Sequence, residues 1–308
     1  MFESFLTNII IEMFLQIKGS KAMRRFKDEM GHANQCLITI LLGLGEIKNQ
    51  GVKFKKPESF STTWAPQNVG ATCDRSRIYA IKSSLSWAID CLDMYITLCL
   101  RKVSIIRDAE LTNKLNGAGQ KVNAKFEALF DALGGEDDTI LKYGAVVALA
   151  IQWRNNSIHY FATNEVEQRY IDIMQAEKVW YYDNCCALKI DEMYSRFQEG
   201  STPTFKDMAS IIRCIQKFVY KVDDLLLSRM DIINYIQEIL REYYEAENTK
   251  AKLPLVPTLS INRQRTKLLN IVQKYFIIPV EKDGFELKDD VVVRLFRTLI
   301  EERRKDLS

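Results

Sequence analysis

Apolar residues recur along most of this chain at the spacing of amphipathic helices. Residues 22–48 and 76–106 carry apolar positions three and four residues apart, which places those positions on one face of a helix. In the second range they are Ile81, Leu85, Ala88, Leu92, Tyr95, Ile96 and Cys99. No proline occurs between Pro66 and Pro203, so long helices are permitted there. The pattern predicts a mainly α fold.

Further helices are predicted by the same criterion at residues 2–18, about 120–133, about 164–198 and about 204–246. Gly134-Gly135 is a natural stop for the helix before it. Asp137 can accept hydrogen bonds from the first turn of the next helix, whose sequence ILKYGAVVALAIQW is apolar on most sides and is expected to be buried. Thr202-Pro203 suits the start of the helix at 204–246, with proline at an early helical position.

Two segments lack a helical period. Residues 49–76 form a long irregular stretch, which contains Lys53, Lys55 and Lys56 together with Phe54, Phe60 and Trp64. Basic and aromatic side chains together can contact single-stranded RNA, although a loop held in place by its aromatic residues has the same composition. Residues 247–262 contain two prolines and are interpreted as a linker. After them, YFIIPVEKDGFEL is typical of a short β-hairpin around Asp283-Gly284.

The order of these elements predicts four segments. Residues 1–75 would hold the N-terminal helices and the long loop, and residues 76–246 a helical bundle. Residues 247–262 would be the linker, and residues 263–308 a small helix–hairpin–helix unit of winged-helix-like type.

Net charge and cysteine content narrow the functional classes only slightly. The net charge of +3 predicts neither a nucleic-acid-binding nor a membrane-binding protein. Residues 251–308 are mildly basic, with 12 Lys and Arg against 8 Asp and Glu, as a solvated helical surface or a phosphate-binding surface would be. The seven cysteines follow no disulfide or metal-binding spacing, which favours a reducing, cytoplasmic compartment. No uncharged apolar run is long enough to predict a membrane-spanning helix.

One short motif, Arg154-Asn-Asn-Ser-Ile-His159, carries candidate chemistry. RNA supplies its own nucleophile, the 2′-hydroxyl, so cleavage needs a group that moves protons and a cation that holds the phosphate. Imidazole, with a reference pKa of about 6.5, can do the first, and guanidinium can do the second through paired donors. Asn155 can add a hydrogen bond to phosphate or orient His159. Residues five apart differ by about 140° around a helix, so Arg154 and His159 can converge only if the helix ends or bends between them or if the arginine side chain folds back.

The motif resembles the Arg-x(4–6)-His signature of HEPN-domain ribonucleases, in which a polar residue, often Asn, follows the arginine and a buried helix leads into the motif. The resemblance covers about residues 76–200 and implies a HEPN-like helical bundle, metal-independent RNA cleavage without a cofactor, and a homodimer with a composite site. It also implies a toxin or anti-phage effector, with an antitoxin or other regulatory partner. Members controlled by adenylylation have Tyr two residues after the histidine; Phe161 stands there in this chain.

Several features bear on how specific this interpretation is. Arg25 and His32 fit the same spacing, but Phe26 follows that arginine, and we interpret this match as accidental. Asp90 and Asp93 are candidates for the acidic residue that many HEPN proteins carry on a preceding helix.

The alternative is a non-catalytic helical protein that binds RNA, dimerises or contacts DNA. In that case His159 ends a helix and Arg154 forms a surface salt bridge. Walker, GxGxxG, GxSxG, HExxH and CxxC motifs are absent, which disfavours the classes that depend on them.

Overall fold

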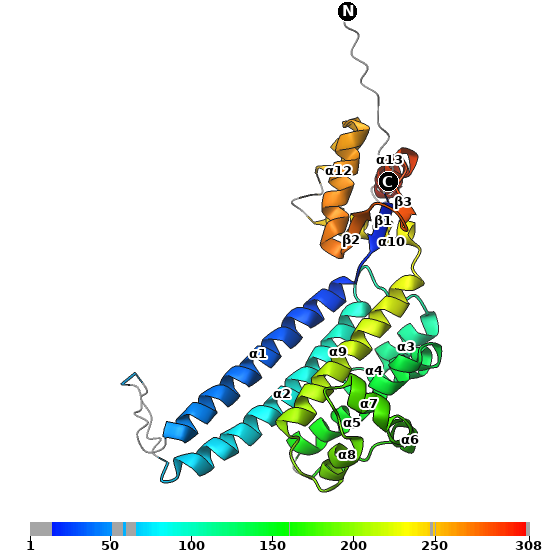
Figure 1. Cartoon of the computed structure of the whole chain (residues 1–308). Coiled ribbons are helices and arrows are strands. Elements are labelled where there is room, and N and C mark those ends of the chain that lie inside the picture. Colours follow the sequence, from blue (N-terminus) through cyan, green and yellow to red (C-terminus); the bar gives the residue numbers. More distant parts are fainter. Residues whose placement is uncertain are drawn as a thin grey trace, which may run out of the picture. The chain divides into compact units, whose positions relative to one another are not determined.

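The computed structural model describes residues 14–50, 58–59, 66–159, 161–246, 249 and 251–305. The described residues form two compact units. The larger unit comprises residues 22–99 and 106–222, and the smaller one combines residues from 1–21, 100–105 and 223–308. The chain is mainly helical with one small antiparallel sheet (Figure 1). None of its described helices is long and apolar enough to cross a membrane.

The larger unit is a bundle of helices. Its elements are α1 (Lys21–Gln50), α2 (Val69–Cys99), α3 (Ala109–Gly117), α4 (Val122–Leu133), η2 (Gly134–Glu136), α5 (Asp138–Ile158), α6 (Gln168–Ala176), α7 (Lys178–Asn184), α8 (Ile190–Gln198) and most of α9 (Phe205–Ser228). Helices α1 and α2 run antiparallel, because Phe26 meets Tyr95 at one end and Lys48 pairs with Asp74 at the other. The predicted boundary at residue 75 therefore lies inside α2, and α1 belongs to this bundle.

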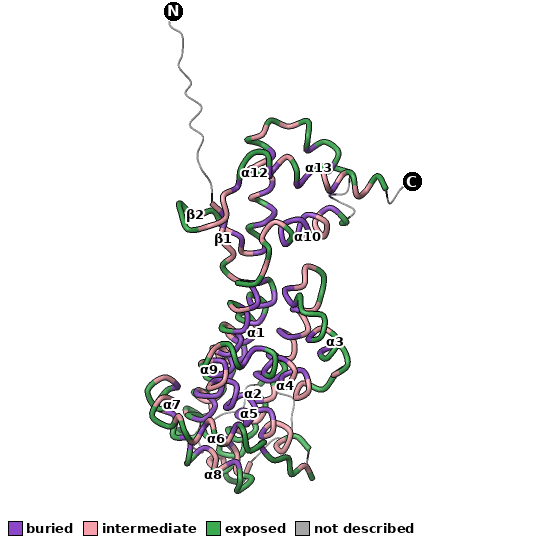
Figure 2. The backbone as a smooth tube through the Cα atoms, turned by 90° about the vertical axis from the view of Figure 1, so that its right-hand side faces the viewer, coloured by how far each residue is buried: buried purple, intermediate pink, exposed green. Residues whose placement is uncertain are grey.

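Helix α5 lies at the centre of the bundle and packs against α2, α4 and α6. Figure 2 shows buried backbone along α2, α5 and α9. The residues of α5 from Tyr143 to Ile151 are all buried, as the apolar sequence predicted. Gly144 permits the closest approach: a Cβ there would lie 2.4 Å from a ring carbon of Phe130. Asp137 caps α5 as predicted, accepting a hydrogen bond from the backbone N–H of Thr139 at 2.7 Å.

Two long predicted helices are each interrupted. The range 164–198 holds α6, α7 and α8 instead of one helix. The range 204–246 divides into α9 and α10 (Ile232–Glu245), because Asp231 caps α10 by accepting from the backbone N–H groups of Ile233 and Asn234. Pro203 precedes α9 instead of lying within its first turn.

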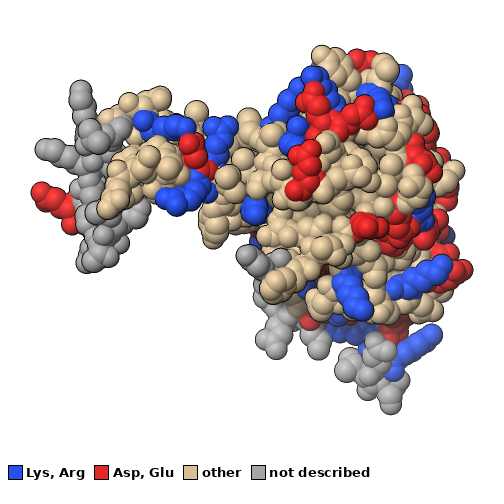
Figure 3. All heavy atoms as spheres, turned by 90° about the horizontal axis from the view of Figure 1, so that it is seen from below, with Lys and Arg blue, Asp and Glu red and all other residues tan. Residues whose placement is uncertain are grey.

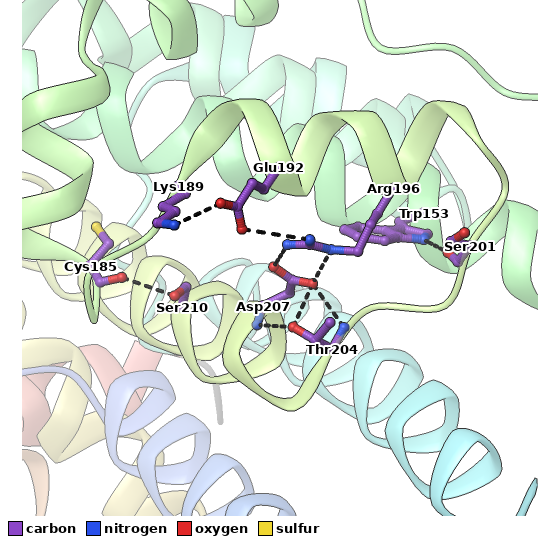
Figure 4. A network of polar contacts seen from close by, with 9 residues as sticks. All are labelled: Trp153, Cys185, Lys189, Glu192, Arg196, Ser201, Thr204, Asp207 and Ser210. Carbon is purple, nitrogen blue, oxygen red and sulfur yellow. Dashed lines mark hydrogen bonds and ion pairs between the residues drawn. The ribbon is translucent and has the colours of Figure 1, made fainter. Parts of the chain in front are cut away.

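A reciprocal pair of hydrogen bonds begins α9 and joins it to α8. Thr204 Oγ1 accepts from the backbone N–H of Asp207 at 3.1 Å, and Asp207 accepts from the backbone N–H of Thr204 at 2.8 Å. The same carboxylate accepts two hydrogen bonds from Arg196 of α8, at 2.9 and 2.7 Å (Figure 4). Asp207 is buried, so this bidentate pair replaces the water that its charge would otherwise require.

The smaller unit contains the sheet and its covering helices. Its elements are β1 (Phe14–Ile17), α10, η3 (Leu253–Thr258), α12 (Ile261–Val272), η4 (Gln273–Tyr275), β2 (Ile277–Val280), β3 (Phe285–Glu286) and α13 (Asp289–Lys305). The segment interpreted as a linker is instead partly helical and packed: η3 contacts α13, and Leu253 and Val256 are buried.

The predicted β-hairpin is wrong. Strands β2 and β3 do not pair with each other, because β1 lies between them in the order β2-β1-β3, antiparallel to both. Leu15 is opposite Pro279 on one side and Phe285 on the other. The prediction of a helix over residues 2–18 is also wrong at residues 14–17, which form β1; residues 2–13 lie outside the described residues. The sequence around Asp283-Gly284 does predict a turn, but the strands on either side of it, β2 and β3, pair with β1 from a distant part of the chain and not with each other.

Gly284 is where β1 comes closest to the turn between β2 and β3. A Cβ there would lie 2.7 Å from the backbone oxygen of Leu15. We expect Gly284→Ala to lower the free energy of unfolding of the smaller unit by about 1–3 kcal/mol, because backbone has to move. The loss of unfolding free energy is measured by urea denaturation, monitored through the hydrogen exchange of β1 amides. Unchanged exchange of the β1 amides in Gly284→Ala would contradict the close-approach argument.

The irregular segment is shorter than predicted. Helix α1 continues to Gln50 and α2 begins at Val69, so helices occupy both ends of the range 49–76. The six basic and aromatic residues singled out there, Lys53, Phe54, Lys55, Lys56, Phe60 and Trp64, lie outside the described residues.

Candidate functional site

The motif lies at the C-terminal end of α5. Helix α5 continues through Asn155, Asn156 and Ser157 and ends at Ile158, so it ends between Arg154 and His159 as expected, one residue before the histidine. His159 is the residue at which the chain leaves the helix, with φ −97° and ψ 108°. Its backbone N–H still donates to Asn155 O at 3.1 Å. The chain therefore leaves the helix at His159, and Arg154 itself is still helical.

Arg154 is partly exposed and is held by two long hydrogen bonds. Its Nη2 donates to Asp90 Oδ1 on α2 at 3.2 Å, and its Nη1 donates to Asn155 Oδ1 at 3.3 Å. Charge-assisted hydrogen bonds are typically about 2.7–2.9 Å long, so both contacts are weak. Among the described residues Arg154 Nε has no partner, although it is buried. An anion could therefore replace the long contacts of Nη1 and Nη2, whereas Nε is buried in this conformation.

Asp90 settles one question that the sequence left open, since it is the aspartate that faces the motif. Its side chain is 65% exposed, and its only described ion pair is the one with Arg154. Desolvation raises the pKa of Asp90 above its usual value, while the charge of Arg154 partly opposes that rise. An exposed pair of this kind contributes little to stability, about 0–1 kcal/mol. The carboxylate is therefore a replaceable partner for the arginine.

Asp93 has a different role. Its carboxylate pairs with Lys125 Nζ of α4 at 2.8 Å, and Thr97 Oγ1 accepts from the same ammonium at 3.2 Å. The Lys125 side chain is 7% exposed. A buried ammonium needs an anionic partner, so Asp93 acts in the packing of α2 against α4 and not at the motif.

Asn155 belongs to a chain of side-chain amides that the sequence did not reveal. Asn155 Nδ2 donates to Gln152 Oε1 at 3.5 Å, and Gln152 Nε2 donates to Asn123 Oδ1 of α4 at 2.9 Å. The spacing of three residues between Gln152 and Asn155 is the sequence feature from which this contact could have been predicted, because such residues are neighbours on a helix surface. These contacts orient the Asn155 oxygen toward Arg154, so Asn155 positions the guanidinium in the absence of a ligand.

His159 is exposed, and the chain after it is fixed by an asparagine pair. Asn156 Nδ2 donates to Asn164 O at 2.9 Å, and Asn156 Oδ1 accepts from the Asn164 backbone N–H at 2.7 Å. Ala162 N–H donates to His159 O at 2.9 Å. The turn that carries His159 is thereby tied back to α5. No hydrogen bond or ion pair joins Arg154 to His159 in the part of the chain that the structure describes.

The second Arg–His pair, Arg25 and His32, is not at the end of a helix. Arg25 and His32 lie inside α1, where Arg25 pairs with Glu29 at 2.6 Å and the intervening Phe26 is buried. His32 is exposed on a continuous helix.

Charged side chains of both signs share the one face of the molecule that Figure 3 draws. On the face seen in Figure 3, acidic and basic side chains are interspersed with uncharged surface. Within the described ranges no group of three or more His, Cys, Asp or Glu side chains is arranged to hold a metal ion.

Comparisons with known proteins identify no relative. No family model matches the chain, and neither a curated protein nor a solved structure matches it significantly.

Proposed function

We propose that this protein cleaves RNA without a metal ion, using the end of α5 as its active site. The observation that supports the proposal most strongly is the state of Arg154. A partly exposed guanidinium, with a buried Nε that lacks a partner and two long hydrogen bonds, stands five residues before an exposed histidine where the helix ends. The resemblance of the motif to HEPN ribonucleases is independent of this geometry.

In the proposed mechanism a phosphodiester replaces Asp90 as the partner of Arg154. Arg154 holds the phosphate and stabilises the charge that builds on its oxygens as the 2′-hydroxyl attacks. His159 transfers protons, either from the 2′-hydroxyl or to the departing 5′ oxygen. Asn155, already directed at the guanidinium, positions Arg154 or donates to the phosphate. The products are a 2′,3′-cyclic phosphate and a 5′-hydroxyl.

A second copy of the chain is the proposed structural partner. Trp87, one turn before Asp90 on α2, is 47% exposed, and Ile158, one turn after Arg154 on α5, is 48% exposed. Large apolar side chains beside the Arg154–Asp90 pair suit an interface that encloses the site. A homodimer would also supply a second Arg–His pair to the same phosphate. A size measurement in solution tests this; a strict monomer that cleaves RNA would contradict the composite site.

The cleavage reaction itself is tested with purified protein and single-stranded RNA in the presence of EDTA. We expect cleavage to proceed at the same rate with and without the chelator. Absence of cleavage over a range of unrelated RNAs, or complete inhibition by EDTA, would overturn the proposal. A toxin or anti-phage role, with an antitoxin or other regulatory partner, is measured separately as growth inhibition on expression.

The proposal also makes a prediction for Asp90. Asp90→Asn removes an anion that competes with phosphate for Arg154, so we expect the KM for RNA to fall by about two- to five-fold at low salt. Asp74→Asn is the matched control, because Asp74 is an exposed, ion-paired aspartate on the same helix. A higher KM in Asp90→Asn alone would show that Asp90 assists substrate binding instead of opposing it.

A further inference from the structure

Two cysteines from separate helices meet in the interior of the larger unit. Cys185 follows the last residue of α7, and Cys214 lies on α9. Both side chains are buried, and the Cys214 thiol donates a hydrogen bond to Cys185 Sγ, with the sulfurs 3.5 Å apart. All seven cysteines are reduced in this structure. This pair takes no part in the proposed cleavage site.

Contacts from α9 hold the backbone around Cys185 in place. Ser210 Oγ donates to Cys185 O at 2.9 Å (Figure 4), and Arg213 Nε donates to Asn184 O at 2.6 Å. Beyond them, Cys186 and Ala187 have φ values of 57° and 53°, in the left-handed region that residues other than glycine rarely adopt. Two such residues in succession persist only where surrounding contacts determine them. The turn therefore keeps Cys185 facing α9, while Cys186 is exposed.

The two thiols of the pair are chemically different. The hydrogen bond from Cys214 lowers the pKa of Cys185; burial opposes that shift, and the positive charge of Arg213 adds to it. Burial raises the pKa of Cys214. Cys185 is thus the sulfur that ionises first, and the thiolate is the nucleophilic form of cysteine. A low-pKa thiol next to a second thiol can be oxidised to a disulfide once peroxide reaches it, and because both sulfurs are buried this requires transient opening around Cys185.

We propose that Cys185 and Cys214 form a reversible internal disulfide when the protein meets a peroxide. Cys185 thiolate attacks one oxygen of hydrogen peroxide, which breaks the O–O bond, leaves a sulfenic acid and releases hydroxide. Hydroxide takes up the proton that Cys185 had lost and becomes water. Cys214 sulfur then attacks Cys185 sulfur and expels the sulfenic oxygen, which leaves as a second water with the Cys214 proton. Two thiols and one peroxide give one disulfide and two waters.

The geometry requires only a local adjustment. The sulfurs must approach from 3.5 Å to the disulfide length of about 2.05 Å. The bond would close a loop that contains α8 and would fix the end of α7 to α9. A cross-link of this kind stabilises the folded state mainly by restricting the unfolded chain. Oxidation should therefore raise the melting temperature of the larger unit.

The test is peroxide treatment of the full chain, followed by alkylation of remaining thiols and tryptic digestion without reduction. We expect the peptide 179–189 to be joined to the peptide 214–217, with reversal by dithiothreitol. The link should persist in Cys186→Ser and disappear in Cys185→Ala. A link from Cys214 to Cys186 would overturn the proposal. So would free thiols at Cys185 and Cys214 after Cys186 has been fully oxidised.

Thermal unfolding provides an independent measurement. We expect oxidation to raise the melting temperature of the wild type and of Cys186→Ser by several degrees, because the cross-link stabilises the folded state. Cys185→Ala and Cys214→Ala should show no rise. Should either alanine variant fail to fold, the other one together with Cys186→Ser still decides the result. An equal rise in all variants would contradict the assignment.

Discussion

Replacing His159 by alanine is expected to reduce RNA cleavage by about 10²–10⁴-fold, the range over which a positioned proton-transfer group acts. His159 is exposed at the end of α5, and within the described part of the chain its hydrogen bonds are made by its backbone. The substitution should therefore leave the fold and the melting temperature unchanged. The measurement is the initial rate of cleavage of a labelled RNA by purified wild-type and variant protein, with circular dichroism to confirm the fold.

His32→Ala is the matched control for this experiment. His32 is the only other histidine and is also exposed, although it lies within a helix, so both variants lose one surface imidazole. We expect His32→Ala to cleave at the wild-type rate. Equal activity in wild type, His32→Ala and His159→Ala would assign the cleavage to other residues and would favour the non-catalytic interpretation of His159 as a helix-ending residue.

The largest effect on stability is expected for Asp207→Ala, at about 3–5 kcal/mol of lost folding free energy. The substitution removes the acceptor of two hydrogen bonds from Arg196 and one from the Thr204 backbone, and it leaves the guanidinium without its main anionic partner. It also removes the half of the reciprocal contact at the start of α9 in which the carboxylate accepts from Thr204, while the Asp207 backbone N–H can still donate to Thr204 Oγ1. Trp87, Trp153 and Trp180 lie in the larger unit, so urea denaturation monitored by tryptophan fluorescence reports on the unfolding of this unit.

Glu192→Ala is the control for the Arg196 pair. Glu192 is exposed, pairs mainly with Lys189, and approaches Arg196 only to 4.0 Å. A surface ion pair is worth about 0–1 kcal/mol, so we expect this variant to remain close to the wild type. Similar losses for Asp207→Ala and Glu192→Ala would show that burial of the carboxylate is not what makes the contact with α8 strong.

The parts of the fold that depend on local signals were predictable. Periodic apolar positions placed α1, α4 and α5 within a few residues, and the acidic side chain of Asp137 caps α5 as its position suggested. The interruption between α7 and α8 had no such signal. It depends on left-handed conformations at Cys186 and Ala187, which contacts from Ser210 and Arg213 on a distant helix maintain.

The sheet was beyond local prediction for a similar reason. The sequence around Asp283-Gly284 predicts a turn, and a turn is present, but the two strands that it connects are separated by β1 from the opposite end of the chain. Only the close contact of Gly284 with Leu15 O shows why glycine is required there. In the candidate site, the sequence indicated the residue types of Arg154, Asn155 and His159. It did not indicate that Asp90, and not Asp93, faces the arginine.

The central claim is that the 2′-hydroxyl of RNA attacks a phosphate held by Arg154 while His159 moves the protons. Its most direct test uses an RNA in which the ribose at a mapped cut site is replaced by 2′-deoxyribose. Wild-type protein is predicted to leave that position intact, to cut the unmodified RNA there, and to leave 2′,3′-cyclic phosphate ends. Cleavage of the deoxy-substituted position at the same rate would contradict the account.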